Sequence, residues 1–298
     1  MRSFDVPEPD YDRYTNRQLL AVPLVILALA LLVVGANVFL IGAPAPLGIE
    51  FTGGTELTVD TTDDVSTIES AFDTEPTDIQ TSQTQSDRYF VTFGPEAGDG
   101  DTSLQEQANE QLEPSQEGGD VVQGVNTFDA TFAENTQQLA LIGVVVAFLG
   151  MSVIAFALFR VFVPSIAIVI SAFSDIMIPL ALMGLVGYEL SLGTVAALLM
   201  LIGYSVDSDI LLNNHVLRRG TGGDFYDDVY RAMHTGVTMT VTSMAAMATM
   251  AIAAFIFGIP LLLAIGTILF VGLAADLMNT YMLNVALLRW YRFDGVNR

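Results

Sequence analysis

The chain contains no cysteine and no lysine, and only two of its 298 residues are histidines. Without cysteine, a disulfide framework and any metal site or nucleophile that depends on a thiol are excluded. The glycine-rich stretch at 220–223 lacks the lysine that a phosphate-binding loop requires. No spacing typical of a nucleophile and its base is found. The sequence therefore predicts neither an enzyme nor a bound cofactor or metal.

Basic residues are scarce, with 11 arginines against 33 acidic residues and a net charge of −22. A nucleic-acid-binding protein needs a basic surface, so this function is excluded. The acidic residues have two interpretations: they chelate cations, or they form a solvated surface adapted to very high salt, where screening weakens their mutual repulsion. We favour the second, which predicts a halophilic organism.

Long apolar runs dominate the sequence, which is 52% hydrophobic. A helix that crosses a bilayer needs about 20 mostly apolar residues. The first run has an acidic leader and too long an apolar core for a signal peptide, so we expect an uncleaved helix. Six stretches meet the length requirement: 19–42, 138–159, 161–186, 190–213, 237–258 and 260–288.

The arginines predict the orientation of these spans in the cell membrane. All of them except Arg88 fall on one side if both termini are cytoplasmic. The predicted organisation is a cytoplasmic segment 1–18, a first helix 19–42, an extracellular domain 43–137, five helices within 138–292 with a cytoplasmic loop at 214–236, and a cytoplasmic tail 293–298. The loop contains a short amphipathic helix, which either docks a cytosolic partner or, as we prefer, lies at the membrane surface.

The extracellular segment 43–137 carries 20 of the acidic residues. Alternating apolar residues predict strands at 49–59, broken at Gly53 and Gly54, and at 89–93 and 121–128. Helices are predicted after Asp63–Asp64 and over 104–112. A disordered acidic loop is the alternative, but the regularly spaced aromatic residues favour a small α+β domain.

Three of the spans contain carboxylates, namely Asp175, Asp207 with Asp209, and Asp276. Asn279 and Thr280 share a helical face with Asp276. Asp207 and Asp209 are separated by about 200° around their helix, so they cannot face one cavity. We expect Asp207 to point inward and Asp209 to lie nearer the membrane boundary or another partner.

An ionised carboxylate inside a bilayer needs a partner or a wet cavity. Desolvation raises a carboxylate pKa, so such a group can bind and release protons near neutral pH. We favour an ion relay formed by Asp175, Asp207, Asp209 and Asp276. The alternative is that these side chains only hydrogen-bond neighbouring helices and move no ion.

Two motifs carry a resemblance to a known family. The stretch Gly48-Ile-Glu-Phe-Thr-Gly-Gly-Thr55 opens the extracellular domain, and Gly203-Tyr-Ser-Val-Asp207 lies on the fourth helix. With the order of one helix, an outside domain and five more helices, they resemble the archaeal branch of the SecF family of protein-export subunits, within the wider SecD/SecF family. The motif residues are Gly48, Glu50, Gly53, Gly54, Thr55, Gly203, Tyr204 and Ser205.

The chain departs from the pattern of this family at several positions. Glu50 stands where many members have aspartate, Asp207-Ser208 replaces an Asn-Asp pair of many bacterial members, and Asn214-His215 replaces an Asp-Arg pair. The assignment of the relay to one carboxylate is therefore left open between Asp207 and Asp209.

The resemblance implies a six-helix bundle that is half of a resistance–nodulation–division-type transporter, surrounded by membrane lipid. It implies SecD, the SecY channel and the translocating polypeptide as partners, and the proton motive force or a sodium gradient as the energy source for protein export. Two alternatives are half of a small-molecule or lipid exporter, and a scaffold subunit that conducts no ions.

Overall fold

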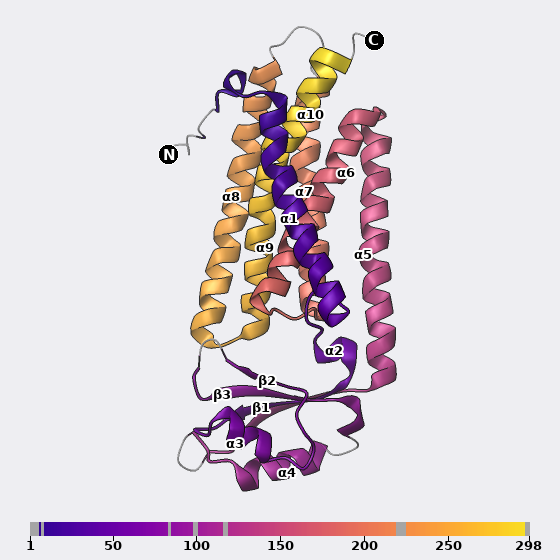
Figure 1. Ribbon diagram of the computed structural model, residues 1–298. Coiled ribbons are helices and arrows are strands. Elements are labelled where there is room, and N and C mark those ends of the chain that lie inside the picture. The colour runs from indigo at the N-terminus through magenta and orange to yellow at the C-terminus, as the bar shows by residue number, and fades with distance from the viewer. Residues whose placement is uncertain are drawn as a thin grey trace.

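The computed structural model describes residues 6, 9–82, 85–97, 101–115, 119–218 and 225–295. It consists of a helical bundle with a small sheet domain at one end, while both ends of the chain lie at the other (Figure 1). The predicted residues Arg2, Arg219, Arg298 and the glycines at 220–223 lie outside the described residues.

Within the described residues, six segments are long and apolar enough to cross a membrane. They are α1 (Asn16–Ile41), α5 (Ala130–Phe159), α6 (Phe162–Val186), α7 (Leu192–Arg218), α8 (Phe225–Phe257) and a last segment. The last one comprises α9 (Pro260–Met278), the π-helical turn η4 (Asn279–Asn284), α10 (Val285–Trp290) and the turn η5 (Tyr291–Gly295). A short helical turn η1 (Tyr11–Arg13) precedes α1.

Local sequence signals explain where several helices begin and where α6 ends. Thr15 and Gln18 form a reciprocal capping box at the start of α1. The side chain of Asp129 accepts hydrogen bonds from the first backbone amides of α5. The α6 helix is capped at its C-terminal end by Gly187, which adopts the left-handed conformation that glycine tolerates best.

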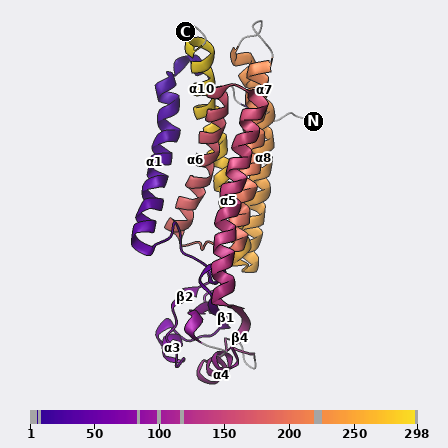
Figure 2. The same cartoon turned by 90° about the vertical axis from the view of Figure 1, so that its right-hand side faces the viewer.

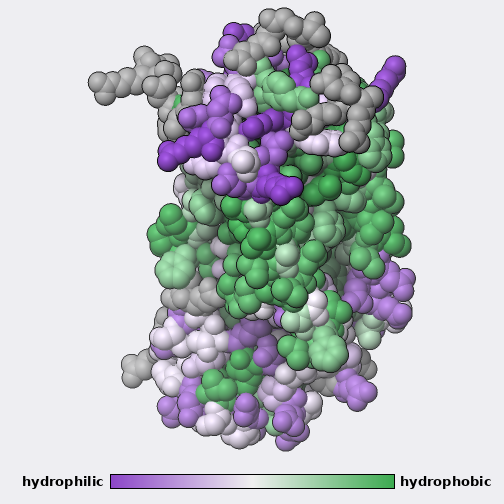
Figure 3. All heavy atoms as spheres, turned by 45° about the horizontal axis from the view of Figure 1, so that its top comes forward, coloured by the Kyte–Doolittle hydropathy of each residue, from purple (hydrophilic) through white to green (hydrophobic). Residues whose placement is uncertain are grey.

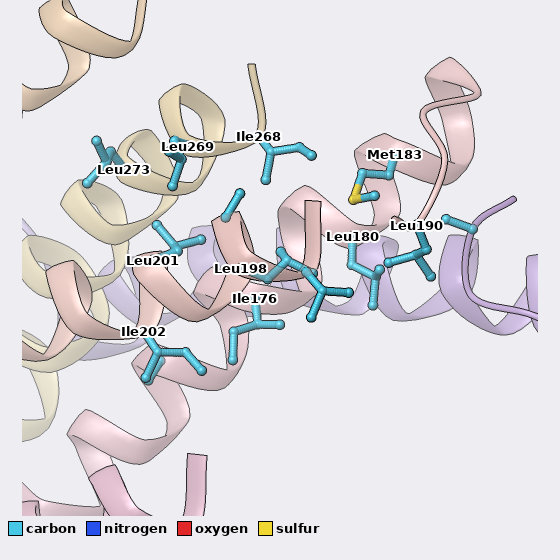
Figure 4. Close-up of a cluster of buried hydrophobic side chains, with 14 of the residues drawn as sticks. Ile176, Leu180, Met183, Leu190, Leu198, Leu201, Ile202, Ile268, Leu269 and Leu273 are labelled. Carbon is cyan, nitrogen blue, oxygen red and sulfur yellow. The ribbon is translucent and has the colours of Figure 1, made fainter. Parts of the chain in front are cut away.

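The apolar core of the bundle lies among α6, α7 and α9. Leu198 and Leu201 of α7 point between Ile176 on α6 and Leu269 on α9 (Figure 4). The apolar stretch of α6 is 61% buried, whereas those of α5 and α8 are 11% buried, so α6 is central and the other two are peripheral. Figure 2 shows α1 on the side of α6 away from α8.

On the face seen in Figure 3, a belt of apolar side chains lies between two more hydrophilic ends. Exposed leucine, isoleucine and phenylalanine side chains, such as Leu32 and Ile256, form this belt. An apolar surface of this extent marks contact with lipid or with another protein. The belt therefore agrees with a bundle that spans a bilayer.

The domain at the other end contains a four-stranded antiparallel sheet in the order β2–β3–β1–β4. Its strands are β1 (Gly54–Asp60), β2 (Asp78–Thr81), β3 (Arg88–Phe93) and β4 (Val122–Phe128). The helices α3 (Val65–Ser70) and α4 (Asp101–Gln111) cover the face turned away from the bundle (Figure 1). Short turns α2 (Ile49–Thr52) and η2 (Pro95–Ala97) complete the domain.

Apolar side chains at every second position of the strands form the core of this domain. The sheet contributes Leu57, Val91 and Phe93, which are fully buried. Ile68 of α3 and Leu104 of α4 belong to the same buried cluster. Leu57 lies opposite Val91 on one side and Val125 on the other. The period of two therefore points one row of apolar side chains at the helices.

The structure differs from the sequence analysis in three places. Residues 49–52 form a helical turn rather than a strand, because a strand pattern resting on Ile49 and Phe51 alone does not specify a strand. The edge strand β2 was not predicted, since Ile79 is its only apolar residue. The predicted loop 214–236 is shorter than expected, because α7 continues to Arg218 and the helix predicted within the loop is continuous with the fifth span, as α8 from Phe225.

Candidate functional site

Three carboxylates meet inside the bundle, brought there by α6, α7 and α9. Asp175, Asp209 and Asp276 have at most 1% of their surface exposed. The side chains around them are hydroxyls and amides, and the only ion pair among the described residues is the distant one between Arg88 and Asp60. Three negative charges without a basic partner are unfavourable in such a place, so protons or other cations must offset them.

Asp175 is held by residues from two other helices. Its Oδ2 accepts a hydrogen bond of 2.5 Å from Ser205 Oγ on α7, and its Oδ1 accepts one of 2.6 Å from Asn279 Nδ2 on η4. Both donors are completely buried. The carboxylate of α6 therefore joins α7 to the last membrane segment.

Asp209 and Asp276 are connected through one hydroxyl group. Thr280 Oγ1 lies 2.8 Å from Asp209 Oδ1 and 3.3 Å from Asp276 Oδ1. Asn284 Nδ2 donates a second bond of 2.9 Å to Asp209, and Ser208 Oγ donates one of 2.8 Å to Asp276. A polar network thus runs across three helices, and the bond from Ser208 Oγ to the carbonyl oxygen of Ser205 links its two parts.

The π-helical turn η4 supplies much of this network. Its residues Asn279, Thr280 and Asn284 are fully buried and all bond to the carboxylates. A π-helical turn widens the helix locally and is frequent at functional sites. The predicted shared face of Asp276, Asn279 and Thr280 is confirmed.

Several buried oxygen atoms near the network have no hydrogen-bond partner within the described part of the chain. They include Asp209 Oδ2, Asn213 Oδ1 and Asn284 Oδ1. Buried polar atoms are rarely left unpaired, and exceptions point to water, an ion or a functional role. Bound water or an ion could satisfy these acceptors.

The expected orientation of the two carboxylates on α7 was wrong. Asp209 points inward and is fully buried, whereas Asp207 is exposed on the opposite side. The separation around the helix was correctly predicted, but the packing of Ser205, Ser208 and Leu212 turns the Asp209 side toward α6 and η4. Asp207 therefore lies outside the network that joins Asp175, Asp209 and Asp276.

Sequence reasoning also missed Ser208 and Asn284. A signal for Asn284 exists, because it follows Thr280 by four residues and so continues the stripe from Asp276. No comparable signal marks Ser208, because serine is common in membrane helices without bonding a carboxylate.

The first motif lies at the boundary between the bundle and the sheet domain. Gly53 and Gly54 have φ angles of +75° and +121°, and a Cβ atom on Gly54 would lie 2.0 Å from the carbonyl oxygen of Phe93. Only glycine tolerates this conformation and this approach. Thr55 is the second residue of β1, where its Oγ1 lies 3.1 Å from Thr127 Oγ1.

The second motif divides between two sides of α7. Ser205 faces the network, whereas Gly203 and Tyr204 share the exposed side with Asp207. A carboxylate exposed on a membrane-length helix costs about 2.5–3.5 kcal/mol when it faces lipid. The exposed half of this motif therefore needs something other than lipid beside it.

A membrane-spanning bundle with a buried carboxylate network defines a multi-pass membrane protein of the transporter class. Residues 109–294 match the model of the protein-export membrane protein SecD/SecF C-terminal region, and residues 38–65 match the SecD/SecF GG motif. The chain belongs to the SecD/SecF family of protein-export membrane proteins, on its SecF side.

Curated relatives align with the chain from end to end. The protein-export membrane protein SecF of Haloferax volcanii is 60% identical, and that of Haloquadratum walsbyi is 58% identical, with all of both chains covered in each comparison. Both are halophilic archaeal relatives, which agrees with the acidic composition. The chain is an accessory subunit of the Sec protein-export machinery.

Solved structures show the same fold. SecDF from Thermus thermophilus superposes with a TM-score of 0.76 at 20% identity, over 96% of this chain and 39% of that one. SecDF in its super-membrane-facing form gives a TM-score of 0.59 at 21% identity, over 99% of this chain and 40% of that one. The chain thus spans about two fifths of the length of those SecDF chains.

Proposed function

We propose that the chain uses an ion gradient across the membrane to promote protein export, with SecD as its partner. The network of Asp175, Asp209 and Asp276 carries this proposal, because three buried carboxylates without a described basic partner need protons or cations. Hydroxyl and amide groups connect them from α6 through α7 to η4. Chains of this kind are the usual material of proton relays in transporters.

SecD is proposed to cover the exposed face of α7. Gly203, Tyr204 and Asp207 lie on this face, and Asp207 requires a polar neighbour rather than lipid. The solved SecDF chains that share the fold are more than twice as long as this one, so they contain much additional protein. In this proposal Asp207 joins the relay only when SecD is bound, and the SecY channel and the exported polypeptide lie beyond that pair.

The orientation in the cell membrane also belongs to the proposal. Arg13, Arg160, Arg231 and Arg289 lie at the end that holds both termini, and Arg88 lies on the sheet domain. The positive-inside rule then places the termini in the cytoplasm and residues 43–137 outside the cell. A single cysteine introduced at exposed Glu75 should react with a membrane-impermeant thiol reagent on intact cells.

The relay is tested in vesicles that contain the chain, SecD and the export channel. We expect an imposed proton or sodium gradient to stimulate export of a reporter polypeptide. Asp175→Asn, Asp209→Asn and Asp276→Asn should each remove this stimulation while SecD still co-purifies. The matched control is Glu110→Gln, because this acid is exposed on α4 far from the bundle. Stimulation that survives all three substitutions would favour a scaffold that conducts no ions.

The alternative of a small-molecule or lipid exporter receives less support. Full-length relatives at 60% and 58% identity are both named as protein-export membrane proteins. The scaffold alternative stays open until the gradient experiment is done, since hydrogen bonds between helices alone also account for the buried network.

A further inference from the structure

The joint between the sheet domain and the bundle contains a second group of acidic side chains. A cavity of about 360 Å³ lies there, and Glu50, Glu56, Glu189, Gln80, Asn126 and Thr194 are among its lining residues. These residues come from the domain, from the loop that connects α6 to α7 and from the first turn of α7. The cavity therefore lies between the domain and the membrane helices and is lined by residues of both.

The backbone of the GG-motif segment is attached directly to the start of α7. The amide of Gly48 donates to the carbonyl oxygen of Leu190 at 2.9 Å, and the amide of Leu190 donates to Pro46 at 2.7 Å. The carboxylate of Glu50 accepts a hydrogen bond from the amide of Leu192, the first residue of α7. The same helix carries Asp209, so the joint and the polar network share one rigid element.

Glu189 lies at the centre of this joint. Its Oε1 accepts a hydrogen bond of 2.8 Å from Gln80 Nε2, which also donates to Asp78 at 2.8 Å. On its other side, a Cβ atom on Gly48 would lie 3.1 Å from Glu189 Oε2, so the side chain is pressed against the motif backbone. Glu189 therefore connects the edge strand β2 to the segment that holds α7.

All charged groups that face Glu189 have the same sign. Glu56 on β1, Asp78 on β2 and Glu50 on α2 repel it, whereas the cavity lining from α9, β3 and β4 is uncharged. Tyr188 is the only other titratable group in that lining. Burial, with this repulsion added, raises the pKa of Glu189 to about 7. Burial also raises the pKa of Glu56.

We propose that Glu50 and Glu189 are positioning residues that make the joint a proton-sensitive latch between the extracellular domain and α7. With Glu189 protonated, the domain is held against the start of α7. When Glu189 loses its proton, repulsion from its acidic neighbours loosens the joint. The latch rests on the proposed function for its role in export, but its movement is measurable without export.

The direction of the pH dependence follows from linkage. In an open joint the Glu189 pKa returns toward its ordinary value of 4.5, and in the closed joint it is about 7. The closed joint therefore binds the proton more tightly. Its stabilisation is fully present below the ordinary pKa and is lost as the pH rises through about 7.

The absence of cysteine allows a direct measurement on the full chain in lipid nanodiscs at molar salt. Spin labels are placed at Glu69→Cys on α3 and Leu185→Cys at the end of α6, both exposed positions. Between about pH 5 and about pH 9 we expect the ratio of longer to shorter label distances to rise about tenfold. A distance distribution that does not respond to pH would overturn the latch.

Two substitutions separate the role of Glu189 from general instability. Glu189→Gln should retain the short distance at every pH, whereas Glu110→Gln should behave like the parent chain. Glu56→Gln removes one repelling charge and should move the midpoint to lower pH, which provides a second test if Glu189→Gln fails to fold. A full pH response in Glu189→Gln, or an unchanged midpoint in Glu56→Gln, contradicts the proposal.

Export measurements keep the two proposals apart. If the latch exists but the buried network carries no ion, Glu189→Gln changes the label distances while Asp209→Asn leaves gradient stimulation intact. If the relay works without the latch, the distances ignore pH while Asp209→Asn abolishes stimulation. Each result identifies which proposal has failed.

Discussion

Asn279 donates a hydrogen bond across the bundle to Asp175, with Nδ2 and Oδ1 separated by 2.6 Å. Both residues are fully buried, and they lie on η4 and α6. The bond connects the π-helical turn to the most central helix of the bundle. The turn also reaches Asp209 through Thr280 and Asn284, so η4 contacts both carboxylates.

Asn279→Ala should weaken the bundle, because it removes one of the two donors that stabilise Asp175. We expect the free energy of unfolding to fall by about 1–3 kcal/mol, measured by detergent-induced unfolding. Asn135→Ala is the control, since Asn135 is exposed and its side chain bonds only to its own helix, at the carbonyl of Thr131. Equal losses in the two variants would contradict the importance of the contact with Asp175.

Thr280→Val replaces the hydroxyl between Asp209 and Asp276 with a methyl group of similar size. The expected loss of stability is about 0.5–2 kcal/mol, in the range found for hydrogen bonds between membrane helices. Gradient-stimulated export should fall with it if the network is a relay. Thr249→Val is the matched control, because the Thr249 hydroxyl bonds only to the carbonyl of Ala245 on its own helix. If Thr249→Val lost as much stability and export as Thr280→Val, the cause would be a general effect of valine in these helices.

The sequence predicted the membrane segments better than the domain. Apolar runs of membrane length are a strong signal, and the six observed helices overlap the six predicted spans. The strand β2 has no such signal, because an edge strand with mostly exposed side chains needs little apolar alternation. The helical turn at 49–52 is held by hydrogen bonds of Gly48 with Leu190 and of Glu50 with Leu192, the first residue of α7, and both partners lie far away in the sequence.

The sequence predicted most of the carboxylates that meet in the site, but not which side of α7 faces it. Three of the four expected relay carboxylates are together, because a charged group in an apolar span has few places to lie. Which side of α7 faces inward depends on the packing of α6 and η4 around it. A helical period alone shows that Asp207 and Asp209 diverge, but it does not select between them.

Gly54→Ala should destabilise the sheet domain selectively. An added Cβ atom would lie 2.0 Å from the carbonyl oxygen of Phe93, and the φ angle of +121° is unfavourable for alanine. We expect a loss of at least about 1–3 kcal/mol, seen as faster proteolysis within residues 43–137. Gly143→Ala on α5 has open space around it and should be neutral or slightly stabilising. If both variants resist protease equally, the close approach at Gly54 is not a constraint.

Tyr11 holds the N-terminal segment across the bundle end that contains both termini. Its hydroxyl donates to the carbonyl oxygen of Tyr281 on η4 at 3.0 Å, and its ring stacks on Tyr226 and Tyr230 of α8. A second bond of 2.8 Å runs from the Tyr230 hydroxyl to the carbonyl of Pro9. The segment is therefore attached both to the π-helical turn and to a peripheral helix.

Tyr11→Phe retains the ring and loses only the hydrogen bond, so attachment should weaken by about 1 kcal/mol. Tyr11→Ala also loses the ring contacts, with an expected cost of about 3–5 kcal/mol. Trypsin cleavage after Arg13 reports the opening, because the chain has no lysine and few competing sites. Cleavage should be slowest in the parent chain, faster in Tyr11→Phe and fastest in Tyr11→Ala, with Tyr14→Phe at an exposed position unchanged. Indistinguishable rates would mean that this segment is held by its backbone contacts, such as the 3.1 Å bond from Arg289 to the carbonyl of Tyr11, and not by the aromatic ring.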